Sequence, residues 1–147
     1  MSGRHFAFWP KGQPRSMSVP ATSLFYNAEV SAARYPDKPY LVFYDTSVSF
    51  AEFRDEAERL AGFLQQACGV RKGDRVLLFM QNSPQYVIGY YGILRADAVV
   101  VPVNPMNLAN ELRHYITDPQ MRVVICSADL AAIVAEANDA VAAEERL

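Results

Sequence analysis

Cysteine is scarce in this sequence. The 147 residues include only Cys68 and Cys126, and neither belongs to a Cys-x-x-Cys pair. Two cysteines are too few for the disulfide framework of a small secreted domain. We therefore expect a reduced, cytoplasmic compartment, with peripheral membrane association left open.

Long apolar runs and a strong excess of one charge are also missing. No uninterrupted apolar stretch reaches the length of a transmembrane helix, and the N-terminus lacks the apolar core of a signal peptide. The net charge of -2 gives no reason to expect nucleic acid or an anionic membrane as a partner. The composition, 51% hydrophobic and 20% charged, is instead that of one folded domain.

The sequence has no recognisable phosphate loop or nucleophile motif. Neither Gly-x-Gly-x-x-Gly nor a glycine-rich loop ending in Lys-Ser/Thr occurs, and Lys72-Gly73 belongs to a turn. Ser83 stands before Pro84 without a Gly-x-Ser-x-Gly elbow, so we interpret it as a helix cap. We therefore predict no catalytic, cofactor-binding or metal-binding residue in this chain.

The histidines and cysteines give no stronger signal. His5 and His114 are isolated in sequence, and Glu111 precedes His114 by three residues, the spacing of a surface pair on a helix. Cys126 follows an apolar run and is interpreted as a buried small hydrophobic residue. Cys68 falls at a helix end, with no cationic neighbour in sequence to activate it.

The most informative stretch of the chain runs from Gly69 to Pro105. An apolar run over 75–80 predicts a buried strand, Asn82-Ser83-Pro84 predicts a helix start, and a second apolar run over 98–103 predicts another strand. Two buried strands joined by a helix form a βαβ unit, with parallel strands and a right-handed crossover.

The flanking patterns extend this unit to a whole domain. Strands are expected near residues 40–44, 75–80, 98–103 and 121–126, and a tight turn at Asp45-Thr46 pairs the first with a short strand over 47–49. Helices are expected from Leu24 to about Tyr35, from Ser49 to about Ala67, from Pro84 to about Arg95, from Asn107 to Thr117 and from Ser127 through Arg146. The fold class is therefore α/β: a mainly parallel, Rossmann-like, doubly wound sheet with helices on both faces.

Residues 1–21 differ in composition from the rest. Pro10, Gly12, Pro14 and Pro20 predict an extended arm without regular structure, and 22–147 form the α/β domain. Phe6, Phe8 and Trp9 are expected to pack on the domain, the alternative being an arm that binds a membrane surface or a partner.

The expected helices over 49–67 and 84–95 have opposite character. Ser49 and Glu52 form a capping box, and Glu52, Arg54, Asp55, Glu58 and Arg59 mark a solvated face. The helix from Pro84 to Arg95 has almost no polar face, which predicts that a further part of the chain covers it. The alternative is a stand-alone interaction module that docks through this helix, and either reading predicts self-association of the isolated chain.

The spacing of several short motifs resembles the N-terminal part of the adenylate-forming superfamily, and most of all the fatty acid–CoA ligases. Ser47-Val-Ser-Phe-Ala-Glu-Phe53 resembles an early motif of that superfamily, and Ile93 to Pro105 resembles its L-(K/R)-A-G-A-x-x-x-P-x-(N/D)-P motif. Asp97 departs from the family's usual glycine, which bears on the tight turn at that point. The resemblance covers roughly Leu24 to Ile125.

The resemblance implies the chemistry of a longer protein. In the family, a fatty acid carboxylate attacks the α-phosphate of ATP to give an acyl-adenylate and pyrophosphate, and CoA then displaces AMP, with Mg²⁺ offsetting phosphate charge. The family's phosphate loop, adenine and metal motifs and lid lysine come later than the part matched here. We therefore interpret the chain as an inactive N-terminal fragment whose main partner is its own C-terminal continuation.

The dipeptide Asn104-Pro105 can be interpreted in two ways. Asn104-Pro105 follows an expected parallel strand, at the edge where open α/β sheets bind ligands. It either lines part of the acyl or nucleotide cleft or forms a turn that redirects the chain, and the turn is favoured.

Overall fold

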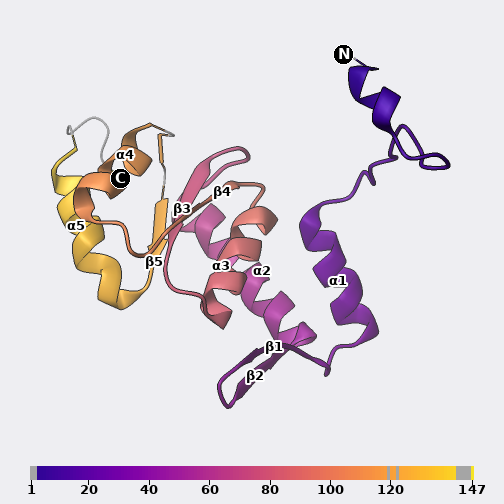
Figure 1. Cartoon of the computed structure of the whole chain (residues 1–147). Helices are drawn as coiled ribbons and strands as arrows, with labels where there is room; N and C mark the ends of the chain where they lie inside the picture. The colour runs from indigo at the N-terminus through magenta and orange to yellow at the C-terminus, as the bar shows by residue number, and fades with distance from the viewer. Residues whose placement is uncertain (1–2, 119, 122, 142–146) are drawn as a thin grey trace.

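The computed structural model describes residues 3–118, 120, 121, 123–141 and 147, and it shows a three-layer α/β/α arrangement (Figure 1). Three parallel strands form the central sheet, in the order β4-β3-β5: β3 (Arg75–Phe79), β4 (Val99–Val103) and β5 (Val123–Cys126). Leu77 of β3 lies opposite Val101 of β4 and Val124 of β5. The expected doubly wound α/β fold is confirmed.

One face of the sheet is covered by helices from the first half of the chain. These are α2 (Phe50–Gln66) and α3 (Pro84–Arg95), and α1 (Leu24–Arg34) packs on the outside of both. Val76 and Leu78 of β3 point to this side, and α2 and α3 bury them in one core with Ile93. The apolar residues that recur every three or four positions in α2 thus pack against alternate residues of β3 in a single apolar layer.

The other face is covered by α4 (Ala109–Thr117) and α5 (Ala131–Asp139), which contact each other. Leu77 and Phe79 point to this side and are packed with Leu112 and Ile116 of α4. A one-turn 3₁₀ helix, Ala128–Leu130, precedes α5. The helix predicted through Arg146 ends at Asp139, and residues 142–146 of that prediction lie outside the described part of the chain.

The strand predicted near residues 40–44 is not part of the parallel sheet. It is β1 (Pro39–Phe43), which pairs only with β2 (Thr46–Ser49) in a separate antiparallel hairpin. The hairpin itself was predicted, but its turn is Tyr44-Asp45, with Tyr44 at φ 52°. The tight turn gives β1 an immediate partner, while β1 and β2 are too exposed to be inner strands.

The N-terminal arm departs from the prediction in two ways. Gly3–Phe8 forms a 3₁₀ helix rather than irregular chain. Its aromatic rings contact one another instead of the domain: the Phe6 and Trp9 centroids lie 5.7 Å apart and Phe8 is 89% exposed. Figure 1 shows the arm extending away from the sheet and its helices.

Helix α3 packs on one side against other helices of this chain. Leu60 of α2 packs on Gly92, Tyr91 meets the buried ring of Phe53 at 5.3 Å, and Arg95 lies over Phe25 of α1. No large hydrophobic side chain of α3 is among the exposed ones of the described residues. Tyr86, Val87, Ile88 and Tyr90 are only partly buried, so α1 and α2 cover part of the apolar surface of α3 and its cover by a further part of the chain stays a prediction.

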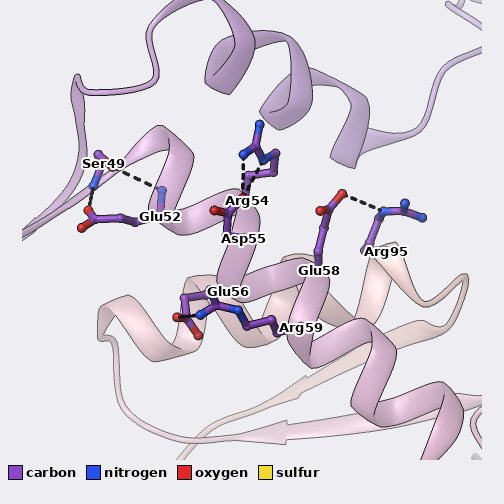
Figure 2. Close-up of polar contacts among 8 residues, drawn as sticks. All are labelled: Ser49, Glu52, Arg54, Asp55, Glu56, Glu58, Arg59 and Arg95. Carbon is purple, nitrogen blue, oxygen red and sulfur yellow. Dashed lines mark hydrogen bonds and ion pairs between the residues drawn. The ribbon is translucent and has the colours of Figure 1, made fainter.

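The polar residues of α2 form the solvated face that was predicted (Figure 2). The capping box is present: Ser49 N donates to the Glu52 carboxylate at 2.8 Å, and Glu52 N donates to Ser49 Oγ at 3.3 Å. Hydrogen bonds from Ser49 lower the pKa of Glu52. Arg95 of α3 meets Glu58 of α2 at 3.7 Å, an exposed pair that adds little stability.

Two turns fix the ends of the central βαβ unit. Gly69 adopts φ 66° just beyond α2, as predicted for a left-handed helix end. Asp97, between α3 and β4, adopts φ 59°. Aspartate tolerates this conformation better than most residues, so the tight helix-to-strand turn forms without the usual glycine.

Candidate functional site

The strand order creates one natural site at the carboxyl edge of the sheet. The chain leaves β3 towards α3 on one face and leaves β5 towards α5 on the other. Neighbouring strand ends that diverge in this way mark the topological switch point, where open α/β sheets bind ligands. We therefore examine the crevice between the ends of β3 and β5 as the candidate site.

A crevice of about 370 Å³ occupies this position. Met80, Gln81, Ser83 and Gln85 line it from the β3–α3 connection, and Cys126, Ser127 and Asp129 line it from the β5–α5 connection. Its volume falls at the lower end of the range of small-molecule pockets. Two amide side chains and one carboxylate give it the means to bind a neutral polar group.

Local sequence positions the first wall of the crevice. Ser83 Oγ accepts a hydrogen bond from Tyr86 N at 3.2 Å, and Pro84 is the first residue of α3. The predicted cap is therefore Ser83, and its hydroxyl is engaged with the backbone. A second hollow of about 320 Å³ is lined by β1, by the start of α3 and by the loop before it, and it shares only Ser83 with the crevice.

The second wall has an unusual polar group. Ser127 Oγ is buried and has no hydrogen-bond partner, although Ser127 N donates to Phe79 O at 3.3 Å. Ser127, where the last helix was predicted to start, stands at the N-cap position of the one-turn 3₁₀ helix, but its side chain makes no cap bond. Burial, with a smaller contribution from Asp129, raises the pKa of the Cys126 thiol, so the thiol stays neutral at physiological pH.

The crevice does not fit ATP or Mg²⁺. None of its lining residues is a lysine or arginine, and Asp129 is its only carboxylate. A triphosphate needs cations or a cradle of backbone N–H groups, and Mg²⁺ bound without phosphates needs several oxygen ligands. Within the described ranges, no group of three or more His, Cys, Asp or Glu side chains is suited to a metal ion.

The other sequence candidates lie apart from this crevice. Lys72-Gly73 forms a turn at the opposite, amino edge, where Gly73 has φ 85° and donates to Asp97 O. The His5 ring contacts the Phe6 ring in the arm at a tilt of 42°, and His114 is exposed on α4. The Glu111 carboxylate accepts from Leu108 N rather than serving His114.

The remaining two candidates have structural roles. Asn104 Oδ1 accepts from Met106 N at 3.0 Å, which is the turn that was favoured for Asn104-Pro105. This turn follows β4, on the far side of β3 from the crevice. Cys68 is partly buried against the core beneath α2 and α3, and both cysteines are free thiols.

Sequence reasoning missed the crevice as a unit. Its two walls lie more than 40 residues apart, and each wall alone reads as a helix start. The signal that could have found it is the strand order: when the chain passes from β4 back across β3 to form β5, the carboxyl ends of β3 and β5 become neighbours.

Among the described residues, no helix is long and apolar enough to span a bilayer.

Comparison with known proteins identifies the family. The family described as AMP-binding enzyme matches residues 28–147. A long-chain-fatty-acid–CoA ligase of Bacillus subtilis is 40% identical over 119 residues, which are 81% of this chain and 21% of the relative. Its counterpart in Escherichia coli O6:H1 is 38% identical over 103 residues, 70% of this chain and 18% of the relative.

Solved structures show the same fold. The N-terminal domain of FACL13 from Mycobacterium tuberculosis superposes with a TM-score of 0.74 at 31% identity, over 82% of this chain and 30% of that one. The long-chain-fatty-acid–CoA ligase FadD1 of Archaeoglobus fulgidus gives 0.72 at 27% identity, over 80% and 25%. The chain spans about a fifth of the length of the curated relatives it matches. It belongs to the AMP-binding enzyme family and corresponds to the N-terminal portion of the adenylate-forming acyl-CoA ligases.

Proposed function

We propose that this chain is the N-terminal segment of an ATP-dependent fatty acid–CoA ligase. The observation that carries the proposal is the 40% identity to a long-chain-fatty-acid–CoA ligase across 81% of the chain. The proposed overall reaction joins a fatty acid to CoA with conversion of ATP to AMP and pyrophosphate. We place it in the cytoplasm, in keeping with two free thiols.

In this proposal the segment is a scaffold, inactive by itself. Its described residues offer no cationic cradle for phosphates at the switch-point crevice. Its buried strand β3, with the partly buried β5 beside it, instead supplies a rigid floor for catalytic groups brought by the rest of the polypeptide. ATP, Mg²⁺ and CoA would be held by that continuation.

The alternative of a stand-alone docking module receives no support from α3. One side of the helix that would dock is covered by α1 and α2, and its aromatic side chains are at least partly buried. We therefore carry forward the ligase proposal alone.

Acid-dependent exchange between ATP and labelled pyrophosphate tests the proposal. The native polypeptide is purified from its source, its intact mass is measured, and exchange is assayed with and without a long-chain fatty acid. We expect a mass several times 16.4 kDa and exchange that requires the acid, with no exchange by residues 1–147 alone. A native mass near 16.4 kDa, or a long polypeptide without acid-dependent exchange, would contradict the proposal.

A further inference from the structure

The N-terminal arm carries apolar side chains that the domain does not cover. Among residues 3–21, only the side chain of Phe6 is even partly buried. Met17 is 85% exposed and Val19 is 78% exposed, and Phe8 and Trp9 are exposed as well. Large apolar side chains that gather on a segment held away from the domain (Figure 1) indicate a site of interaction with another molecule or surface.

The arm is folded on itself, so that its aromatic rings and one cation lie together. Trp9 Nε1 donates a hydrogen bond to Pro14 O at 3.2 Å, which turns the chain back. The Arg15 guanidinium then lies over the Phe6 ring, 5.4 Å from its centroid, and the Phe6 ring meets the Trp9 ring edge to face. A hollow of about 550 Å³ beside them is lined by arm residues alone. The arm therefore presents apolar and cationic groups together without help from the domain.

The net charge of the chain conceals an uneven distribution. Residues 1–21 contain Arg4, Lys11 and Arg15 and no acidic residue, which gives the arm a charge of +3. The whole chain has 14 Lys and Arg against 16 Asp and Glu, so residues 22–147 have 11 against 16 and a charge of −5. An anionic surface attracts the arm and repels the domain, which orients the chain with its arm towards that surface.

A lipid bilayer matches this combination of groups. Tryptophan and phenylalanine insert at the boundary between head groups and acyl chains, while arginine and lysine stay with the anionic head groups. Stable attachment takes two signals, and the arm has both an apolar and a cationic one. A second arm would be repelled by its like charge. The family match begins at residue 28, so the shared domain does not account for the arm.

We propose that the N-terminal arm binds the surface of a membrane that contains anionic lipids. Phe8, Trp9 and Met17 insert among the head groups, and the three arm cations contact the lipid phosphates. This binding goes beyond the proposed function and does not depend on ligase activity. It suits a fatty acid–CoA ligase, because long-chain acids partition into bilayers through their apolar chains and the arm would hold the enzyme where they collect.

Co-sedimentation of the full-length polypeptide with lipid vesicles tests the proposal. Vesicles of an equal mixture of phosphatidylglycerol and phosphatidylcholine are compared with vesicles of phosphatidylcholine alone. Each cation near an anionic surface favours binding about fivefold, so we expect the three arm cations to raise the partition coefficient ~100-fold on the mixed vesicles. High salt should remove this difference. Equal partition onto both kinds of vesicle at low salt would overturn the proposal.

Two triple variants separate the arm cations from the overall charge. The arm variant replaces its three cations: Arg4→Gln, Lys11→Gln and Arg15→Gln. The matched control replaces three exposed cations of the domain: Arg71→Gln, Lys72→Gln and Arg113→Gln. We expect the arm variant to bind mixed vesicles ~100-fold more weakly and the control to bind nearly as wild type. Equal losses in the two variants would refute a role of the arm.

Trp9 reports whether the apolar side chains insert. It is the only tryptophan of the 147 residues, so the tryptophan fluorescence of this chain comes from the arm. We expect a blue shift with mixed vesicles and quenching by lipids brominated on their acyl chains. Phe8→Glu should weaken binding at least ~10-fold, and Phe63→Glu in α2 is its control. An unshifted spectrum, or a Phe8→Glu variant that binds like wild type, would overturn the proposal.

Measurements without vesicles distinguish other occupants of the arm. Deletion of residues 1–21 should change neither the sedimentation nor the melting temperature of the full-length polypeptide. A smaller species after the deletion would mean that the arm binds a second copy, and a lower melting temperature would mean that it packs on the rest of its own chain. Either result would overturn the proposal. Vesicle binding without acid-dependent exchange of pyrophosphate would refute the ligase activity alone.

Discussion

Two serines that each precede a helix behave differently in this fold. The hydroxyl of Ser49 accepts a hydrogen bond from Glu52 N in the capping box of α2. The hydroxyl of Ser127 is buried at the switch-point crevice without a partner. A satisfied cap stabilises a helix, whereas an unsatisfied buried hydroxyl lowers stability because it has lost its hydrogen bonds to water.

The serine pair gives a prediction at this scale. We expect Ser49→Ala to lower the free energy of unfolding by about 1 kcal/mol. Ser127→Ala, the matched control, should leave the stability within about 0.5 kcal/mol of wild type or raise it. Urea unfolding followed by circular dichroism measures both. A larger loss for Ser127→Ala than for Ser49→Ala would mean that the Ser127 hydroxyl has a bonding partner in solution.

At the scale of elements, the contact between α2 and α3 holds the first layer together. A Cβ at Gly92 would lie 2.8 Å from Leu60 Cδ2 and 3.1 Å from Leu60 Cβ. The Cβ of leucine is fixed to its backbone and cannot rotate away. Gly92 therefore sets the approach distance of the two helices, as its place in an otherwise bulky helix suggests.

Glycine substitutions at and away from this contact separate packing from helix propensity. We expect Gly92→Ala to destabilise the fold by about 1–2 kcal/mol, since overpacking outweighs the gain in propensity. Gly62→Ala in α2 is the control: nothing lies within 4 Å of its added Cβ, so stability should rise by up to about 1 kcal/mol. Thermal unfolding measures the stability of both variants. A Gly92→Ala variant more stable than wild type would contradict the expectation, because it would mean that α2 and α3 move apart without loss of stability.

At the scale of the whole molecule, an apolar groove stays open between α2, α3 and β5. Phe63 of α2 is 59% exposed there, and the partly buried Ile88 of α3 lines the same groove. An uncovered apolar groove next to an unpaired strand favours association between copies.

Self-association of residues 1–147 should therefore depend on Phe63. We expect concentration-dependent dimers or larger species by sedimentation, and a Phe63→Glu variant that remains monomeric under the same conditions. Phe8→Glu is the control, because Phe8 is 89% exposed on the arm and away from the groove. Strictly monomeric wild type at high concentration, or equal effects of the two variants, would exclude this surface.

The sequence alone determined the elements whose signals are local. Helix starts were predicted from the capping box of α2 and from Pro84 of α3, and the parallel strands were predicted from the apolar runs of β3, β4 and β5. These predictions succeed because caps and periodicity act within a few residues. The family resemblance also came from short motifs in order, and the comparisons confirmed it.

Only the tertiary structure decided how distant segments share surfaces. It placed β1 in a separate hairpin, packed α1 and α2 against α3, and joined Ser83 and Ser127 in one crevice. An apolar helix face in the sequence indicates that something covers it, but it does not indicate what. Burial against any apolar neighbour lowers the free energy of the folded state by about the same amount per unit area. Strand order and crossover handedness make that choice, and among the described residues they leave β5 paired on one side only.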